Sequence, residues 1–599
     1  MSKNELKKTL LFPKYAVLIY ILAMLLILFK EVLIASTPLI LNIMVDGAVL
    51  GKEVEPSIVL SFVSSFTDVE KGFASIASLS LMMFLFYMIA VTFAYFSDVL
   101  NAIATEEIIK RFRDAVHRSI QRFTYQHYMN CETGDLIQRC TTNIDTIKTT
   151  LNHFFVKSVA IIFSVIYIFS LMLAQNARMA LFSSFSVPII FLSSFLFFVY
   201  IKKQEAKAYE KESSMTQIAQ ESLTGMRVVK AFSMQEYEMR KFEEASLIYT
   251  QANYKINRLE SIFWAGLDAI TFMQIIFVTF YGSYLAYLGE MTVGQVVAFS
   301  QYVGMLVFSV RHLGRIVSNF GRLTVSIKRI KGVLNAPKEE FGQEELACED
   351  VKFLQDSIQF ENVSFAYPSQ AEKKILSDVS FNIKEGEMLG IMGMTGSGKT
   401  SIVYLLERLY SQNTGSIKIG GVDIQSISLP QLRASLGVVL QEPFLYSKSI
   451  KENIRIGHPL ASDEEVIEAS KKASLHEDVM SFKDGYDTIV GENGITLSGG
   501  QKQRLSIART LLKDAPIIVF DDSLSSVDSA TDAQIRSAIF NMKANKILIV
   551  ISHRLSSVMD ADKIIVLEDG RVKEEGTHEE LMKMEGSYRR VYEVQNAIV

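Results

Sequence analysis

Long apolar stretches dominate the first half of the chain. The hydrocarbon core of a bilayer is about 30 Å thick, so an α-helix of about 20 apolar residues is long enough to cross it. Six stretches reach this length, near residues 15–46, 78–100, 154–174, 179–201, 261–286 and 292–312. The pattern predicts a membrane region of six helices. We expect the first helix to be retained, because it runs past signal-peptide length without a small-residue cleavage site.

Basic residues are distributed unevenly among the connections between these helices. Segments 110–148 and 202–258 carry seven and ten Lys or Arg, whereas turns 174–179 and 287–292 carry one and none. Cytoplasmic connections of membrane proteins are enriched in Lys and Arg. We therefore expect a multi-pass protein of the plasma (inner) membrane, with both termini and the second half of the chain in the cytoplasm.

Glycine and proline are absent from the long segments around the basic connections, for example between Gly72 and Gly134. At about 1.5 Å per residue, a helix over 78–130 would be about 75–80 Å long, far more than a bilayer needs. We therefore expect helices with long cytoplasmic extensions. Gly134 and Gly225 would lie at two elbows that transmit movement to a domain below the membrane, although an ordinary helix break fits these residues equally well.

Ionisable residues occur inside the predicted spans. They are Glu31, Asp98, Lys157, Asp268 and Arg311, with Asp46 near the outer end of the first helix. Charges are costly within a bilayer, and they are often functional there. These residues either line a polar cavity or gate, or form inter-helix pairs and interfacial contacts. We favour the second interpretation, although the carboxylates hint at cationic amphiphiles as cargo.

Short β-like runs alternate with helical segments after residue 357. The runs are 358–367, 388–392, 437–440, 517–520, 547–551 and 563–567. Such alternation is typical of a mainly parallel α/β core with its ligand at the strand ends. An acidic segment over 333–356 precedes it. We therefore expect a transmembrane domain over 1–332, a linker over 333–356 and an α/β domain over 357–599.

One segment of the α/β domain has the spacing of a phosphate-binding loop. Gly393-Met-Thr-Gly-Ser-Gly-Lys-Thr400 lies between run 388–392 and a helix-like segment. In such a loop, backbone N–H groups and the helix N-terminus hold phosphate oxygens, the lysine reaches the β- and γ-phosphates, and the final hydroxyl binds Mg²⁺. The expected ATP ligands are Gly393, Thr395, Gly396, Ser397, Gly398, Lys399 and Thr400, and the family resemblance described below adds Ser401. The domain is thus expected to be an α/β P-loop ATPase cassette.

Two carboxylates and a histidine follow later strands of this domain. Asp521 and Asp522 come directly after run 517–520, and His553 follows run 547–551. A carboxylate at this place holds Mg²⁺, and its neighbour orients an attacking water. We therefore predict Asp521 as a metal ligand beside Thr400, and Asp522 and His553 as catalytic residues near the γ-phosphate.

Composition excludes several other classes of protein. With 61 Lys+Arg against 65 Asp+Glu, the formal net charge is −4, which gives no sign of nucleic-acid binding. Hydrophobic residues make up 49% of the chain, which agrees with a lipid bilayer as partner. The three cysteines have no metal-ligand spacing and no arrangement that indicates a disulfide framework.

The segment Leu497-Ser-Gly-Gly-Gln501, with its sequel Lys502-Gln-Arg-Leu-Ser-Ile-Ala-Arg509, resembles the signature of ATP-binding cassette (ABC) proteins. Six spans followed by one cassette resemble a half-transporter of the exporter class, similar to bacterial multidrug and lipid exporters. The resemblance covers essentially the whole chain. It implies an ATPase that drives the export of hydrophobic or amphiphilic compounds.

The resemblance also implies roles for single residues. Tyr367 would stack on adenine, and Asp528 would cross to a partner cassette. Gln441 would be a catalytic residue that contacts Mg²⁺ and faces the membrane domain. The glycine elbows would be coupling helices. A helix N-terminus suits a phosphate, and in this family the signature binds the ATP of the opposite cassette, so one chain cannot complete a site alone. The signature residues here are Ser498, Gly499, Gly500 and Gln501.

Asp522 departs from the family, which has Glu as the catalytic base at this position. One methylene fewer withdraws the carboxylate by roughly 1–1.5 Å, and a misplacement of about 1 Å costs about 100-fold in rate. We therefore expect a site that binds ATP well and hydrolyses it poorly, in a heterodimer with a second ABC half-transporter subunit. The alternatives are a homodimeric exporter of lipid or peptide and, less favoured, a nucleotide-gated channel or sensor.

Overall fold

The computed structural model describes residues 13–52, 58–66, 69, 72–339, 356–522, 534–537, 540 and 543–596. Contacts divide the chain into two compact units. Unit 1 comprises residues 1–122 and 131–336, and unit 2 comprises residues 123–130 and 337–599. Unit 2 therefore includes a short segment, 123–130, that lies within the sequence of unit 1.

Every secondary-structure element described for unit 1 is helical. Its helices are α2 (Lys14–Ile43), α3 (Ile58–Ser64), α4 (Phe73–Gln121), α6 (Thr133–Cys140), α7 (Thr142–Thr149), α8 (Val156–Gln175), α9 (Ala177–Ser184), α10 (Ser186–Thr224), α11 (Met226–Ala231), α12 (Gln235–Tyr287) and α13 (Val293–Leu334), with π-helical turns η1 (Met44–Val49) and η2 (Thr150–Phe155). Within the described residues, six helical stretches are long and apolar enough to cross a membrane. They begin at Lys14, Phe73, Thr133, Ala177, Gln235 and Val293, which confirms the six predicted spans.

The second membrane helix ends earlier than the sequence predicts. Helix α4 ends at Gln121 and is followed by the separate short helix α5 (Tyr125–Met129), whereas one helix over 78–130 was expected. The break falls where Thr124 accepts a hydrogen bond from the backbone N–H of His127 and so acts as the N-cap of α5. Gly134 lies in the first turn of α6, after this break. A capping threonine, and not a glycine, marks the place where the long helix ends.

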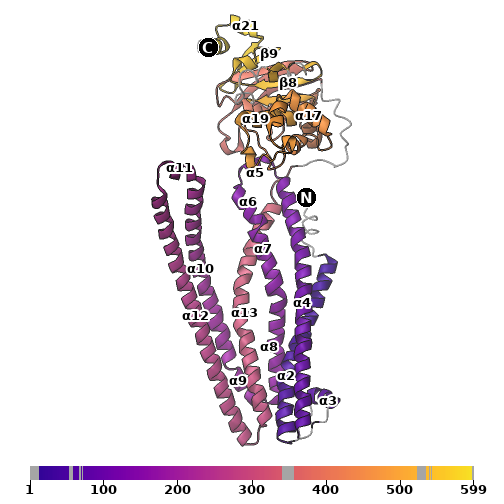
Figure 1. Ribbon diagram of the computed structural model, residues 1–599, viewed down its shortest axis with the longest axis vertical. Coiled ribbons are helices and arrows are strands. Elements are labelled where there is room, and N and C mark those ends of the chain that lie inside the picture. The colour runs from indigo at the N-terminus through magenta and orange to yellow at the C-terminus, as the bar shows by residue number, and fades with distance from the viewer. Residues whose placement is uncertain are drawn as a thin grey trace. The chain divides into compact units, whose positions relative to one another are not determined.

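Helices α10 and α12 form a long pair joined by α11. Figure 1 shows the two helices running side by side, with α11 across one end. Gly225 is the C-cap of α10, and its backbone N–H donates to the carbonyl of Glu221 over 2.8 Å. The polar sequences on either side of Gly225 are helical, as the absence of internal glycine and proline predicts.

Asp46 stabilises the start of α13. Its Oδ1 accepts a hydrogen bond from the backbone N–H of Gly294 over 2.9 Å, and it is buried. A Cβ at position 294 would lie 2.6 Å from the other carboxylate oxygen of Asp46, so only glycine fits here. Thr292 and Gln295 complete a capping box. Asp46 therefore acts as a structural residue at a helix N-terminus, where a negative charge is favourable.

Asp268 and Arg311 form an ion pair between α12 and α13. Nη1 of Arg311 lies 2.6 Å from Oδ1 of Asp268, and the guanidinium lies 5.1 Å from the ring centre of Trp264. The favoured interpretation of intramembrane charges as inter-helix pairs is confirmed for these two residues. Glu31 pairs instead with its neighbour Lys30, over 2.7 Å.

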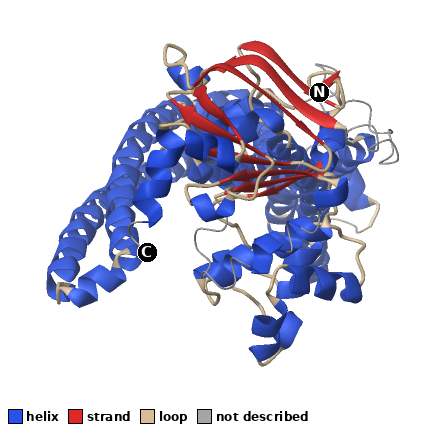
Figure 2. Ribbon diagram, turned by 90° about the horizontal axis from the view of Figure 1, so that it is seen from above, coloured by secondary structure: helices blue, strands red, loops and turns tan. Residues whose placement is uncertain are grey.

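Unit 2 contains two β-sheets, which Figure 2 shows as two groups of strands. The larger has the order β10-β9-β3-β8-β7-β6, in which all neighbours except β10 and β9 are parallel. Its strands are β3 (Met388–Gly393), β6 (Leu436–Val439), β7 (Ile517–Asp521), β8 (Ile547–Ile551), β9 (Lys563–Glu568) and β10 (Arg571–Gly576). Five of these are the predicted strands of the parallel core. A six-helix membrane region followed by an α/β cassette is therefore the fold, as predicted.

The smaller sheet was not predicted. It is antiparallel, with the order β2-β1-β4-β5, and comprises β1 (Ser357–Phe365), β2 (Leu376–Lys384), β4 (Thr414–Ile419) and β5 (Val422–Asp423). Run 358–367 was expected in the parallel core and lies here instead. Its pairing is set by contacts between distant strands, such as the stacked rings of Phe360 and Phe381, 4.4 Å apart.

Helices cover both faces of the larger sheet. They are α14 (Lys399–Leu406), α15 (Leu429–Ser435), α16 (Ile450–Arg455), α17 (Asp463–Lys472), α18 (His476–Ser481), α19 (Gly499–Leu512), α21 (His578–Lys583) and α22 (Ser587–Asn596). Alternate residues of β7 belong to different hydrophobic clusters, Ile518 and Phe520 to one and Ile517 and Val519 to the other. The larger sheet is thus buried on both faces, as parallel sheets usually are, and the candidate site lies at the ends of its strands.

Candidate functional site

The loop between β3 and α14 is closed by its lysine. Nζ of Lys399 donates to the carbonyls of Gly393 and Met394, each over 2.8 Å. Burial lowers the pKa of Lys399, and the negative charges of Asp522 and Asp521 oppose this effect. The ammonium group is thus positioned inside the loop by backbone carbonyls, with two carboxylates nearby.

Glycine is required at two positions of this loop. Gly393 has φ +151°, and a Cβ there would lie 2.3 Å from the carbonyl oxygen of Leu567. Gly398, the N-cap of α14, has φ +100°, and its Cβ would meet Leu376 Cδ2 at 2.6 Å. Both backbones adopt conformations that side chains disfavour. Gly396 also has positive φ, but it faces open space and, like Thr395, is exposed.

Two hydroxyl groups test whether this loop fits a phosphate. Oγ of Ser397 is buried and has no hydrogen-bond partner within the described part of the chain. An unpartnered buried hydroxyl is costly, so a phosphate oxygen would satisfy it. Oγ of Ser401 shares a hydrogen bond of 2.9 Å with the hydroxyl of Tyr367. The donors and the glycine turns of the loop therefore fit a phosphate group.

Asp521 ends β7 beside the first turn of α14. Oγ1 of Thr400 donates to Oδ1 of Asp521 over 3.4 Å. Burial raises the pKa of Asp521; Asp522 raises it further, whereas the Thr400 hydrogen bond, Lys399 and His553 lower it. The predicted metal ligands Thr400 and Asp521 are thus neighbours. An oxygen pair of this kind suits Mg²⁺, which is usually completed by waters and substrate phosphates.

Asp522 and His553 lie at the adjacent ends of β7 and β8. The backbone N–H of Asp522 donates to the carbonyl of Ile551 over 2.8 Å. Asp522 has φ +44°, a left-handed conformation that Asp tolerates better than most residues. His553 follows Ser552, whose N–H donates to Ile391 in β3 over 3.2 Å. The structure therefore brings Lys399, Thr400, Asp521, Asp522 and His553 near one another, where the first turn of α14 meets the ends of β7 and β8.

The signature forms the N-terminus of α19. Ser498 is the N-cap: its Oγ accepts from the N–H of Gln501 over 3.3 Å, and Oε1 of Gln501 accepts from the N–H of Ser498 over 3.0 Å. Gly499 and Gly500 form the exposed or half-buried first residues of the helix. Among the described residues, no hydrogen bond or ion pair joins 498–501 to 393–401. The structure therefore does not place the signature on this chain's own phosphate loop.

Gln441 follows β6 and is exposed. The carbonyl of the preceding Leu440 accepts a hydrogen bond from Nε2 of Gln503 over 3.3 Å. Gln503 lies on α19, so the signature helix fixes the backbone next to Gln441. Sequence reasoning did not identify Gln503, because its contact spans 63 residues.

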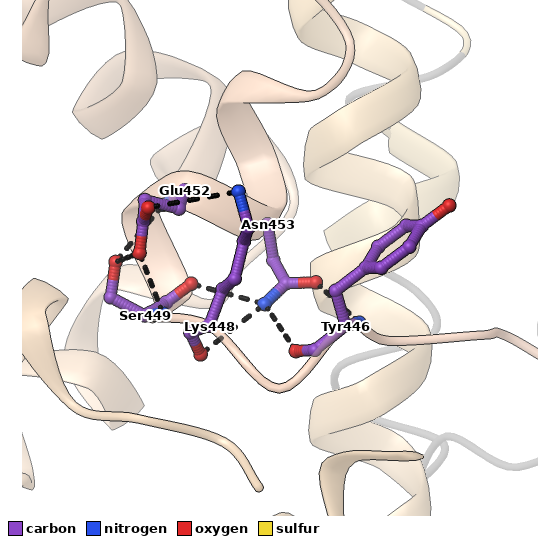
Figure 3. A network of polar contacts seen from close by, with 5 residues as sticks. All are labelled: Tyr446, Lys448, Ser449, Glu452 and Asn453. Carbon is purple, nitrogen blue, oxygen red and sulfur yellow. Dashed lines mark hydrogen bonds and ion pairs between the residues drawn. The ribbon is translucent and has the colours of Figure 1, made fainter. Parts of the chain in front are cut away.

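A polar network orders the segment after Gln441 (Figure 3). Nδ2 of Asn453 donates to the carbonyls of Tyr446 and Ser449 over 3.0 and 3.1 Å, and Ser449 forms a capping box with Glu452. Nε of Arg509, on α19, donates to the carbonyl of Asn453 over 2.9 Å. The signature helix is thus connected to the segment after Gln441 at a second point.

Helix α5 packs within unit 2 against α14. The ring of Tyr125 lies 5.8 Å from that of Tyr404 and 5.6 Å from that of Tyr410. Tyr410 also contacts Tyr367, at 5.2 Å, edge to face. An aromatic cluster therefore connects α5, the helix after the phosphate loop and the residue predicted to stack on adenine. Asp528 lies outside the described residues.

Comparison with known proteins identifies the family. Residues 20–310 match the family model described as "ABC transporter transmembrane region", and residues 376–525 match that described as "ABC transporter". The solved structure of a bacterial Atm1-family ABC exporter with ATP bound has 24% identity and a TM-score of 0.80, covering 97% of this chain and 98% of that one. This likeness shows the fold.

Curated relatives match over nearly the whole chain. The "Uncharacterized ABC transporter ATP-binding protein YknU" of Bacillus subtilis (strain 168) is 32% identical, covering 93% of this chain and 92% of the relative. The "Putative multidrug export ATP-binding/permease protein YgaD" of the same organism is 30% identical over 94% of each chain. The chain belongs to the ABC transporters and is a half-transporter of the exporter fold, with its transmembrane region and its ATP-binding domain in one polypeptide.

Proposed function

We propose that this chain is one subunit of a heterodimeric ABC exporter that uses ATP to move hydrophobic or amphiphilic compounds out across the plasma (inner) membrane. The observation that carries the proposal is Asp522, where the family has Glu, beside an otherwise complete set of Lys399, Thr400 and Asp521. This site binds ATP and hydrolyses it slowly, while the partner's site hydrolyses it rapidly. A similar protein with "multidrug export" in its name supports the cargo class.

The residues of the site divide the work of binding and hydrolysis. The loop 393–401 holds the phosphates, and Thr400, Asp521 and Gln441 hold Mg²⁺. Tyr367 offers its ring to adenine, and Asp522 with His553 orients the attacking water. Bound ATP with Mg²⁺ supplies the phosphoryl group whose transfer to water resets the cycle.

Ser498, Gly499, Gly500 and Gln501 act on the partner's ATP in this proposal. Their position at the exposed N-terminus of α19 supports it, because the capping box uses the N–H groups of Ser498 and Gln501 and leaves those of Gly499 and Gly500 to meet a phosphate. The second ABC half-transporter would offer its own signature to loop 393–401 in return. Residues 1–332, 333–356 and 357–599 serve as transmembrane domain, linker and nucleotide-binding domain, with both termini and the cassette in the cytoplasm.

Helix α5 and helix α11 are the proposed coupling helices. The first lies ahead of Gly134, between α4 and α6, and its Tyr125 contacts the aromatic residues next to α14. Within unit 2, packed aromatic rings therefore connect the helix after the phosphate loop to α5. The chain itself continues from α4 through α5 to α6.

Purification from the native membrane tests the subunit composition. The tagged chain should co-purify with a second half-transporter that carries Glu at the position of Asp522. The pair should accumulate an amphiphile in proteoliposomes only with ATP. Recovery of only this chain as an active homodimer would replace the heterodimer, and equilibration of the compound without accumulation would indicate a channel.

A further inference from the structure

Unit 1 contains a cavity of about 600 Å³ between α2, α4, α8 and α13. Each helix contributes residues at helical spacing, such as Ile27, Glu31 and Ile34 on α2, so the cavity lies along one face of each helix. A volume of this size accommodates a small organic ligand. The cavity lies within the part of the chain that forms the membrane spans.

Four ionisable residues line this cavity. Lys30 and Glu31 neutralise each other through an ion pair of 2.7 Å. Asp98 on α4 and Lys157 on α8 line the same cavity, and in the described part of the chain neither has an ion-pair or hydrogen-bond partner. The cavity therefore has one carboxylate and one ammonium group that are available to a ligand.

Unpaired charges in a membrane span are costly unless water or a counter-charge reaches them. Asp268 and Arg311, which do not line the cavity, neutralise each other's charge through a direct ion pair. Asp98 and Lys157 do not pair with each other, although they share one cavity. A ligand that carries both signs of charge would satisfy both groups at once, whereas a singly charged ligand would leave one of them uncompensated.

The rest of the cavity wall is largely apolar. Ile161 lies on α8, and Met305 and Phe308 lie on α13. Methionine and aromatic side chains form adaptable surfaces for hydrocarbon. The cavity thus combines one free charge of each sign with a surface for an alkyl or aromatic tail.

We propose that this cavity binds zwitterionic amphiphiles, with the cationic group of the ligand at Asp98, its anionic group at Lys157 and its tail against Met305 and Phe308. The inference deepens the proposed export function, because it names the cargo class, and it rests on that function for the use of the cavity. Lys157 changes the expectation drawn from the carboxylates alone, which indicated cationic amphiphiles.

Equilibrium binding without nucleotide tests this inference separately from transport. The purified protein is placed in nanodiscs of phosphatidylglycerol, so that the lipid supplies no competing zwitterion. Dodecylphosphocholine is the zwitterionic probe, and dodecyltrimethylammonium, dodecyl phosphate and dodecyl maltoside are the cationic, anionic and neutral probes. The zwitterion should bind about tenfold more tightly than each of the other three. Equal affinities for all four probes would overturn the proposal.

Charge variants assign the two contacts. Asp98→Asn should remove the preference for the zwitterion over dodecyl phosphate, and Lys157→Gln should remove its preference over dodecyltrimethylammonium. The Asp268→Asn/Arg311→Gln double variant, which also removes one charge of each sign, should keep both preferences. The swapped pair Asp98→Lys/Lys157→Asp should still select the zwitterion, because both charges remain. Selectivity that survives Asp98→Asn/Lys157→Gln contradicts the proposal.

The assay also distinguishes failure of this inference from failure of the proposed function. Because it contains no nucleotide, loss of ATP-driven transport does not affect its outcome. If the zwitterion shows no selectivity while ATP-dependent accumulation of another amphiphile persists, only the cargo assignment fails. If the zwitterion binds selectively but no transport occurs, the export function fails and the binding site stands.

Discussion

The side chain of Gln595 forms hydrogen bonds to the backbone of both His553 and Leu555. Its Nε2 donates to the carbonyl of His553 over 2.8 Å, and its Oε1 accepts from the N–H of Leu555 over 3.0 Å. Gln595 belongs to α22, so the C-terminal helix fixes the segment that presents the histidine. Two hydrogen bonds from one side chain restrict the backbone of residues 553–555 more than a single bond would.

Gln595→Ala should therefore lower ATP turnover at this chain's own site several-fold while leaving the apparent affinity of that site for ATP nearly unchanged. Two hydrogen bonds of about 0.5–1.5 kcal/mol each are lost. Their loss lets His553 move but leaves the phosphate loop unchanged. Single-turnover hydrolysis at varied ATP, by a pair whose partner site has been inactivated, separates kcat from KM at this site.

Two further variants test the specificity of this effect. Gln595→Glu keeps the acceptor for Leu555 but places a carboxylate against the carbonyl of His553, so turnover should fall as with alanine. Val594→Ala, at an exposed neighbouring position on α22, should have no effect. A change in KM without a change in kcat would exclude a positioning role for Gln595.

Lys399→Ala should weaken ATP binding by the full chain about 10- to 100-fold. The lost contact is a hydrogen bond to a charged group, worth about 1.5–3 kcal/mol. Lys399→Arg keeps the charge but not the compact shape that lies between the carbonyls of Gly393 and Met394, and should recover only part of the affinity. Lys373→Ala removes an exposed lysine of the same unit and serves as control. Binding of a fluorescent ATP analogue measures each affinity; equal values for the two alanine variants would contradict the assignment.

Features encoded locally were predictable from the sequence. Run 388–392 and the glycines after it determine a strand, a turn and a helix within about 20 residues, and β8 has the predicted bounds, Ile547–Ile551. Asp521 and His553 meet at one edge because parallel strands end on the same side of a sheet. Periodicity and spacing were sufficient for these features and for the six membrane helices.

Features that depend on distant contacts were not predictable. The pairing of β1 with β2 and β4 requires strands from three segments, and apolar runs do not distinguish it from a parallel arrangement. Helix α5 packs against the ring of Tyr404, 279 positions after Tyr125 in the numbering. Gln595 contacts a segment 42 residues away. No local pattern reports any of these contacts.

Glu407, directly after α14, should make the stability of the folded chain depend on pH. Burial raises its pKa from 4.5 to about 7, with Arg433 and Lys513 opposing the rise and Asp521 adding to it. Below about pH 4.5 the carboxyl is protonated in both the folded and unfolded states, and its contribution is fully present. That contribution is lost as pH rises through about 7, and the loss reaches about 3 kcal/mol.

Glu407→Gln removes this titration. The difference in Tm between the variant and the wild-type protein should therefore increase in favour of the variant between pH 4.5 and 7, and stay constant above that range. Glu372→Gln, at an exposed position, should show no such trend. A constant difference between wild type and Glu407→Gln across the whole range would show that Glu407 does not titrate near pH 7.

Ser498→Ala should lower the turnover of the assembled pair at least tenfold, because the hydroxyl is proposed to contact the partner's ATP. The substitution also removes the N-cap of α19, which costs about 1 kcal/mol. Ser498→Asn restores a capping oxygen without placing a hydroxyl at the same point, so it should restore Tm and not turnover. If Ser498→Asn restores both, the residue acts only as a helix cap.

Asp522→Glu should raise hydrolysis at the site of this chain by about 10- to 100-fold, since the added methylene returns the carboxylate by roughly 1–1.5 Å. The backbone opposes part of this gain, because φ is +44° at this residue and Glu tolerates the left-handed conformation less well than Asp. We therefore expect a small fall in Tm together with faster single-turnover hydrolysis by a purified pair whose partner site has been inactivated. Asp522→Asn, which keeps the length and removes the charge, should lower the residual rate. If Asp522→Glu leaves the rate unchanged while ATP still binds, the carboxylate's reach is not what limits this site, and the asymmetry of the proposed pair must have another origin.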